Sequence, residues 1–103
     1  MKVRFTRPAQ RDLAQIHDYI SDDSPDIATR FVSRLVERSR ELADNPFQGR
    51  ETDEPNVRVI AAPKLRYLIF YLVTGDEIHF THIRHTSRRR PPGWGRQAAL
   101  RDA

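Results

Sequence analysis

Residues 65–73 read Leu-Arg-Tyr-Leu-Ile-Phe-Tyr-Leu-Val, and the predicted architecture follows from this run. Apart from Arg66, both alternating sets of side chains in it are apolar. A strand with one exposed face alternates apolar and polar residues, whereas a strand covered on both faces is apolar throughout. We therefore predict a central strand over residues 65–73, with both of its faces covered.

Further strands are predicted on both sides of this run. Thr74-Gly75-Asp76-Glu77 is typical of a tight turn, and residues 78–85 have the pattern of the returning strand of a hairpin. Residues 57–61 form another strand candidate, which Pro63 ends, after a polar connection over residues 45–56. Together these segments predict an antiparallel sheet.

The first half of the chain has the periodicity of helices. Residues 8–22 place apolar side chains at helical spacing, at Leu13, Ile16 and Ile20. The polar residues between them are expected on the other faces of this helix: Asp12, Gln15, Asp18 and Asp22. The stretch predicts one amphipathic helix.

A second helix starts almost at once. Ser24 is a good capping residue, Pro25 suits the first helical turn, and the apolar period continues to about residue 44. Two helices joined by so few residues are expected to lie antiparallel, as a helical hairpin. With a short strand at residues 2–6, the predicted order is βααβββ. This is an α+β domain in which the helical hairpin packs on a small antiparallel sheet.

The composition suits one small domain. The chain has 103 residues, of which 38% are hydrophobic, and this is enough for a modest core. It has no cysteines and no apolar run of the length that crosses a membrane. Its N-terminal residues 1–5 alternate charged and apolar side chains, unlike a secretory signal. We therefore expect a cytoplasmic protein without disulfides, thiolate-bound metals or membrane association.

Positive charge is concentrated at the C-terminal end. Residues 84–103 carry six arginines and one aspartate, a local charge of +5, while the first 83 residues carry −1. This asymmetry favours an acidic partner or nucleic acid at that end. We divide the chain into a domain over residues 1–89 and a basic tail over residues 90–103. Within the tail, Trp94 is expected either to anchor the tail onto the domain or to insert into a partner.

Few residues suggest catalysis with a metal or a nucleophile. His79, His82 and His85 are spaced by three, but the alternation of a strand directs His79 and His85 to one face and His82 to the other. We therefore predict no metal site. The chain has no glycine-rich phosphate loop, and nothing like a nucleophile elbow surrounds Ser87. We expect no cofactor.

A basic cluster is the remaining candidate site. Arg58 and Arg66 are assigned to adjacent strands, and Arg84 and His85 end the last strand. Three further arginines follow directly: Arg88, Arg89 and Arg90. If these residues converge, they form a donor-rich surface suited to phosphate or carboxylate. His85 with Arg66 or Arg58 could supply two roles in metal-free RNA cleavage, and the structural alternative is a salt bridge for Arg66 and a sheet-edge position for His85.

Several segments form a specific set when they are taken in order. They are AQRDLAQI at 9–16, YI at 19–20, Pro25 with Ala28 and Phe31, LADNP at 42–46 with GR at 49–50, VR at 57–58, RYLIFY at 66–71 and IRHTSR at 83–88. In this order the chain resembles the ParE/RelE superfamily of type II toxin–antitoxin toxins, in its ParE-like branch. The fold of that family is a helical hairpin on an antiparallel sheet, in agreement with the prediction above.

The resemblance implies a small toxin that a cognate ParD-like antitoxin neutralises, with operator DNA bound only through the complex with the antitoxin. ParE-like members poison DNA gyrase, and RelE-like members cut mRNA on the ribosome. The chain has only two lysines, Lys2 and Lys64, and no tyrosine after Tyr71, which favours the ParE-like activity. We therefore predict a non-enzymatic gyrase poison. The alternatives are a ribosome-dependent mRNA endonuclease that uses His85, Arg66 and Arg58, and an inactive antitoxin-binding module.

Two sets of binding residues are assigned on this basis. The residues expected to bind the target are Arg58, Arg66, Arg84, His85, Arg88, Arg89, Arg90 and Trp94. Tyr19 and Phe31 are expected to bind the antitoxin, because they are apolar residues on the helical hairpin that could be exposed to a partner. No catalytic residue is assigned to a gyrase poison.

Overall fold

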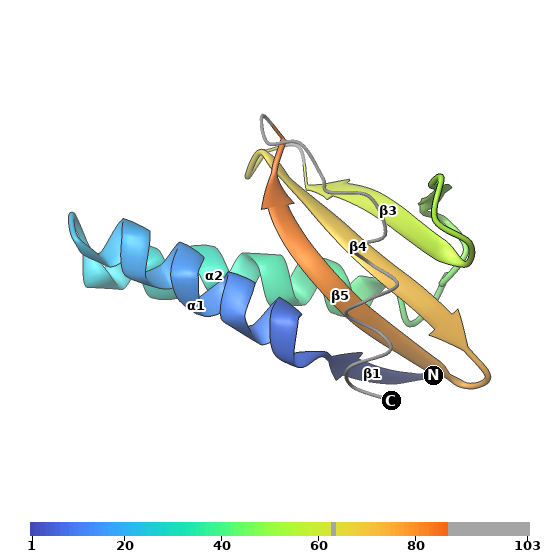
Figure 1. The fold of residues 1–103 in the computed structure, drawn as a ribbon. Coiled ribbons are helices and arrows are strands. Elements are labelled where there is room, and N and C mark those ends of the chain that lie inside the picture. Colours follow the sequence, from blue (N-terminus) through green and yellow to red (C-terminus); the bar gives the residue numbers. More distant parts are fainter. Residues whose placement is uncertain (63, 87–103) are drawn as a thin grey trace.

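The computed structural model describes residues 1–62 and 64–86, which form two helices and a five-stranded sheet (Figure 1). Along the chain the elements are β1 (Lys2–Phe5), α1 (Arg7–Ser21), α2 (Pro25–Glu41), β2 (Arg50–Glu51), β3 (Val57–Ala62), β4 (Tyr67–Thr74) and β5 (Glu77–His85). The strand order in the sheet is β1-β5-β4-β3-β2. The predicted α+β architecture, a helical hairpin on a small sheet, is confirmed.

Side-chain caps define where both helices begin. The Thr6 hydroxyl accepts a hydrogen bond from Ala9 N at the start of α1, and the Ser24 hydroxyl accepts one from Ile27 N at the start of α2. The second helix ends at Glu41, a few residues before the predicted end, because the backbone from residue 42 to 45 continues as turns with i to i−3 hydrogen bonds. The helices lie against each other as the predicted hairpin.

The sheet differs from the prediction in two details. It is mixed, because β1 pairs in parallel with β5, while the other neighbouring strands are antiparallel. In addition, the segment predicted to be a polar connection contains β2, whose Arg50 pairs with Val59 of β3. The parallel pairing arises because the chain leaves β1 through both helices and returns to the β1 side of the sheet only with its last strand.

The two faces of β4 pack against different groups of residues. Ile69 and Tyr71 belong to the main core, which includes Leu35 and Leu42 from the second helix and its end. Phe70 points to the opposite face and packs with residues of β3 in a second, smaller cluster. We call these the helix face and the outer face of the sheet. Both alternating sets of apolar residues in β4 therefore pack against a cluster, one on the helix face and one on the outer face.

A β-bulge interrupts β5. Phe80 pairs with Tyr71, but the next paired residue, His82, lies opposite Phe70, which leaves Thr81 as the extra residue. Residues on the two sides of Thr81 therefore no longer alternate in register. A prediction that assumes strict alternation along the strand therefore assigns the residues after Thr81 to the wrong face of the sheet.

The bulge separates the histidines differently from the prediction. His85 pairs with Tyr67 and shares the helix face with the core residue Ile83, whereas His79 pairs with Leu72 on the outer face. The prediction that His79 and His85 face the same way is therefore wrong, because it assumed an unbroken strand.

Candidate functional site

A buried carboxylate of α1 lies at the edge of β5. The side chain of Asp12 is 6% exposed, and it occupies the buried stripe of the helix, four residues after Pro8 and four before Ile16. The sequence analysis predicted Asp12 on one of the other, polar faces of this helix, and that prediction is wrong. A buried carboxylate is costly unless donors surround it, so its partners explain its location.

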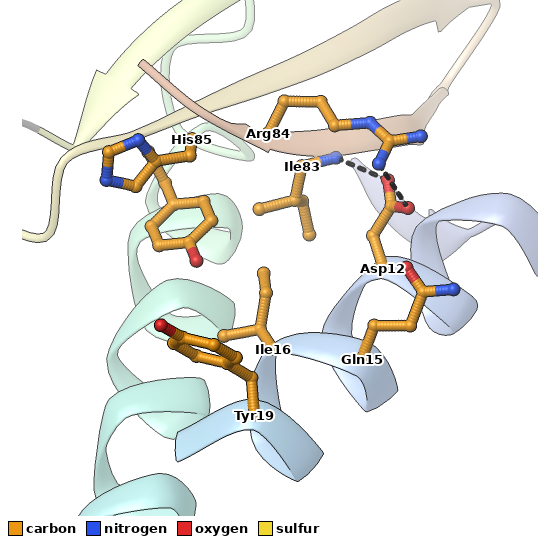
Figure 2. Close-up of a pocket in the computed structure, with 8 residues that line it drawn as sticks. Asp12, Gln15, Ile16, Tyr19, Ile83, Arg84 and His85 are labelled. Atoms are coloured by element: carbon orange, nitrogen blue, oxygen red, sulfur yellow. Dashed lines mark hydrogen bonds and ion pairs between the residues drawn. The ribbon is translucent and has the colours of Figure 1, made fainter. Parts of the chain in front are cut away.

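Beyond the end of β1, the Asp12 side chain is a hydrogen-bond partner of the β5 backbone. The strand β1 pairs with β5 only as far as Phe80, whose carbonyl oxygen accepts hydrogen bonds from the Thr6 backbone N–H at 3.0 Å and hydroxyl at 2.8 Å. Beyond that point, Asp12 Oδ2 accepts from Ile83 N at 2.9 Å (Figure 2). The same oxygen lies 3.2 Å from His82 Nδ1. Asp12 therefore satisfies backbone that would otherwise be an unpaired sheet edge.

The same carboxylate positions a guanidinium. Asp12 Oδ1 lies 3.7 Å from Arg84 Nη1, and the Arg84 side chain is 29% exposed (Figure 2). The charge of Arg84 is consequently held near the rim of the sheet rather than swinging freely on a long side chain.

A pocket of about 390 Å³ opens between α1 and the ends of β4 and β5. Its lining combines two phenols, an imidazole, a guanidinium, an amide and a carboxylate with two isoleucines: Asp12, Gln15, Ile16, Tyr19, Tyr67, Ile83, Arg84 and His85 (Figure 2). The rings of Tyr67 and His85 meet edge to face, with their centroids 5.4 Å apart. Such a mixed aromatic and cationic lining suits the side chains of a protein partner.

Arg58 lies away from this pocket. Its guanidinium donates to the carbonyl oxygen of Gly49 at 2.8 Å, pairs with Glu51 at 3.4 Å and lies 5.1 Å from the centre of the Phe47 ring. These contacts tie the segment after α2 to β3. The structure therefore gives Arg58 a structural environment and does not bring it to the other candidate residues.

Tyr71 fastens the same segment from the neighbouring strand. Its hydroxyl donates to Pro46 O at 2.8 Å and accepts from Gly49 N at 2.9 Å. Burial raises the pKa of the Tyr71 hydroxyl above its ordinary value, and the hydrogen bond from Gly49 and the charge of Arg58 partly oppose this rise. Gly49 is required here because a Cβ atom would lie only 2.8 Å from Tyr71 Cε1.

Three of the predicted basic residues do come together. His85 and Arg84 are the last two residues of β5, and the carbonyl oxygen of Arg66 accepts from Thr86 N at 3.0 Å directly beyond them. Arg66 does not lie in a strand as expected, because its φ of 60° places it in a turn before β4, and it is exposed. Together Arg66, Arg84 and His85 form what we call the basic end of the sheet.

The two predicted antitoxin-binding residues have different environments. Tyr19 is 80% exposed and lines the pocket, as expected of a contact residue. Phe31 is half-buried, packs against the main core and meets the Tyr67 ring edge to face at 5.7 Å. Tyr67 thus connects Phe31 to His85, so both predicted residues border the basic end.

The remaining predictions lie partly outside the described residues. Arg88, Arg89, Arg90, Trp94 and the tail over residues 90–103 belong to that part of the chain. Within residues 1–62 and 64–86, no group of three histidine, cysteine, aspartate or glutamate side chains could hold a metal ion. None of the helices in the same described part is long and apolar enough to cross a membrane.

The sequence reasoning missed Asp12, His82 and Tyr67 as parts of the site. One signal was available for Asp12, because its spacing of four from both Pro8 and Ile16 places it on the buried stripe of the first helix. No such signal exists for His82, whose position depends on the bulge in β5. For Tyr67, the apolar run over residues 65–73 predicted only a place in the central strand.

Comparison with known proteins places these features in a family. A family model described as "ParE toxin of type II toxin-antitoxin system, parDE" matches residues 3–90. A protein of Sinorhizobium fredii named "Putative toxin Y4kP" is 30% identical over 90 residues, which cover 87% of this chain and 93% of the relative.

A solved structure has the same fold. It comes from the chromosomal ParDE toxin–antitoxin system of P. aeruginosa and superimposes with a TM-score of 0.75 at 29% sequence identity. The match covers 84% of this chain and 97% of that one. Both the helical hairpin and the sheet that carry the basic end and its pocket therefore lie within a known architecture.

Proposed function

The chain belongs to the ParE toxin family, and we propose that this type II toxin acts by poisoning DNA gyrase and is neutralised by a cognate ParD-like antitoxin. The basic end of the sheet is the proposed contact with the gyrase. The pocket beside it is the proposed contact with the antitoxin. Operator DNA would be bound only through the toxin–antitoxin complex.

The distance between Arg58 and His85 is the observation that favours a gyrase poison over an mRNA endonuclease. Metal-free RNA cleavage needs a base, a cation and an acid within hydrogen-bond reach of one phosphodiester. His85 pairs with Tyr67 and Arg58 pairs with Tyr71, four residues further along β4. At about 3.3 Å per residue, this is about 13 Å along the strand. Arg58 therefore lies too far from His85 to share one phosphate with it, which supports a gyrase poison over an endonuclease that uses Arg58 together with His85 and Arg66.

The basic end is suited to electrostatic contact. Arg66 is exposed at the turn before β4, and Arg84 is held at the sheet rim by Asp12. Arg88, Arg89 and Arg90 continue the charge directly along the sequence. Clustered arginines favour a carboxylate-rich or phosphate-rich partner surface. We propose that these residues, together with His85, bind the target.

Neutralisation is explained by the position of Tyr19. This exposed phenol lines the same pocket of about 390 Å³ as Arg84 and His85. An antitoxin segment that buries the Tyr19 ring would therefore also cover the rim of the basic end. Exposed aromatic residues beside arginine are typical anchors of protein interfaces. We propose that the antitoxin inhibits the toxin by occluding the target-binding residues.

Two assays distinguish the proposed function from its alternatives. Purified toxin is added to a gyrase supercoiling reaction and, separately, to a translation reaction with intact ribosomes. We expect inhibition of supercoiling that the antitoxin reverses, with unchanged translation and intact mRNA. Cleaved mRNA would instead support the endonuclease. A chain that binds antitoxin but affects neither reaction would be an inactive antitoxin-binding module.

Arginine variants locate the contact. Arg66→Ala removes an exposed charge of the basic end, and we expect at least a tenfold higher toxin concentration for half-inhibition of gyrase. Arg30→Ala removes an exposed charge from α2 and serves as the matched control, with no expected change. Equal potency of the two variants would contradict the proposed contact.

A further inference from the structure

The pocket beside the basic end of the sheet has a lining whose charges compensate each other. Its carboxylate and its guanidinium, Asp12 and Arg84, lie 3.7 Å apart, and Asp12 also accepts a hydrogen bond from the buried Ile83 N–H. An ion that entered the pocket would lose its water and meet a charge of each sign. The pocket itself therefore favours an uncharged group over an ion.

The rest of the lining suits a flat ring with a polar edge. Ile16 and Ile83 are only 8% and 2% exposed and form the apolar floor, whereas Tyr19 is 80% exposed at the mouth (Figure 2). The amide of Gln15 offers both a donor and an acceptor to the edge of such a ring. A nucleobase combines an apolar face with a polar edge, and unpaired bases stack on tyrosine rings. The volume of about 390 Å³ lies in the usual range of small-ligand pockets.

Two exposed cations lie directly beside this pocket. Lys64 and Arg66 belong to the turn before β4, and Tyr67, the next residue, lines the pocket. Among residues 1–62 and 64–86, no acidic side chain forms an ion pair with either cation. The flanking stretch over residues 55–75 contains no aspartate or glutamate. The charges of Lys64 and Arg66 are therefore available to an anion next to the pocket.

A nucleotide has both properties that this surface requires. Its base is uncharged, and its phosphate is an anion only one sugar away. A free phosphate would leave the aromatic pocket unused, and a carboxylate inside the pocket would meet the carboxylate of Asp12. In a duplex the base is stacked and paired, so a single strand is needed to present its base to a pocket.

We propose that the basic end and its pocket bind one nucleotide of a single-stranded nucleic acid, with the base against Tyr19 and Tyr67 and the phosphate at Lys64 and Arg66. This inference rests on the proposed function only for the source of the strand, which is then the DNA that gyrase handles. The contact of the toxin with its target thus includes a strand and not protein alone. An antitoxin that covers Tyr19 would exclude that strand.

Strand binding is measured by fluorescence anisotropy with a labelled hexamer of deoxyadenosine and the full-length toxin, freed from its antitoxin. Tyr19→Ala removes a stacking ring and should weaken binding at least fivefold, whereas Tyr19→Phe should bind normally. Phe47→Ala is the matched control, because this ring is 61% exposed and lines a different pocket, and it should bind normally. Equal losses for Tyr19→Ala and Phe47→Ala would overturn the proposed base contact.

The salt dependence of binding tests the phosphate contact separately. Each phosphate that a protein neutralises on a single strand contributes about −0.7 to the slope of log K against log salt concentration. Replacement of both Lys64 and Arg66 by alanine should therefore make this slope less steep by about 0.7. Lys2→Ala, at the exposed lysine of β1, is the control and should leave the slope as it is. An equal slope in the double variant and the natural chain would overturn the phosphate contact.

Unlabelled competitors distinguish nucleotide binding from simple charge attraction. Hexaglutamate and a hairpin duplex should each displace the labelled strand at least tenfold less well than the unlabelled deoxyadenosine hexamer, and equal displacement by either would overturn the proposal. The ribose hexamer should compete as well as the deoxyribose one, because neither proposed contact uses the 2′-hydroxyl. Binding of the ribose strand alone would overturn the proposal.

A parallel supercoiling assay separates this inference from the proposed function. A toxin that inhibits gyrase but binds no strand would contradict only the nucleotide site. A toxin that binds the strand through Tyr19 and Arg66 but leaves gyrase active would contradict only the proposed target.

Discussion

Replacement of Asp12 by alanine tests the role of its carboxylate in completing the β5 edge. The substitution removes the acceptor for the buried Ile83 N–H, the neighbour of His82 Nδ1 and the counter-charge of Arg84. An unpaired buried N–H costs about 1–3 kcal/mol. The ion pair with the partly exposed Arg84 adds at most about 1 kcal/mol.

These contributions predict a loss of about 3 kcal/mol in the free energy of unfolding. In a domain of this size, each kilocalorie per mole lowers Tm by roughly 4–8 °C, so the expected decrease is about 12–24 °C. The measurement is urea and thermal unfolding of the full-length chain, separated from its antitoxin under denaturing conditions and refolded. Asp12→Asn retains an oxygen that can accept from Ile83 N, and we expect it to fall between the alanine variant and the natural chain.

Asp18→Ala is the matched control. It makes the same chemical change on the same helix at a side chain that is 84% exposed, so it corrects for the higher helix propensity of alanine. We expect a change of less than about 0.5 kcal/mol. If Asp12→Ala and Asp18→Ala agree within that margin, the reasoning about the β5 edge is wrong.

Three further substitutions test other contacts. Tyr71→Phe leaves Gly49 N–H and Pro46 C=O without their partner, and urea unfolding should show a loss of about 1–3 kcal/mol. Because burial raises the pKa of Tyr71, the natural chain should be fully stabilised below about pH 10 and lose this contribution as the pH rises through the folded-state pKa, and the phenylalanine variant should lack this loss. Gly49→Ala forces a methyl group against the Tyr71 ring, so unfolding should show a loss of about 1–3 kcal/mol, and an unchanged Tm would contradict the close packing. Tyr19→Ser should weaken antitoxin binding at least tenfold in calorimetry without a change in Tm, whereas Ile27→Ser should bind normally.

Much of the fold could be predicted because its signals are local. The apolar run over residues 65–73 predicted a strand buried on both faces, and β4, which begins at Tyr67, has core residues on one face and the outer-face cluster on the other. Ser24 and Pro25 marked the start of α2 correctly, since capping depends only on a hydrogen bond between residues three apart. The family resemblance rested on the order of such segments and is confirmed.

The candidate site was predictable only in part. The sequence left open whether the basic residues converge, and the structure brings Arg84 and His85 next to Arg66 because all three lie at the same end of the β4–β5 hairpin. Arg58 was a further candidate for this cluster, but its position depends on the pairing of β3 with β4. It pairs with Tyr71, four residues along β4 from Tyr67, the partner of His85. Side chains that meet across strands cannot be deduced before the register is known.

The sequence by itself determined the helices, the main strands and the α+β class, because hydrophobic periodicity and capping act between residues close in the chain. Only the tertiary structure decided that β1 pairs in parallel with β5, that Thr81 forms a bulge and that Asp12 is buried against Ile83. Asp12 and Ile83 are 71 residues apart, and the carboxylate is stable there only because β1 ends at Phe5 and leaves the next N–H of the β5 edge without a strand partner. Such a need arises from the assembled sheet, since an unpaired buried donor exists only after the strands have come together.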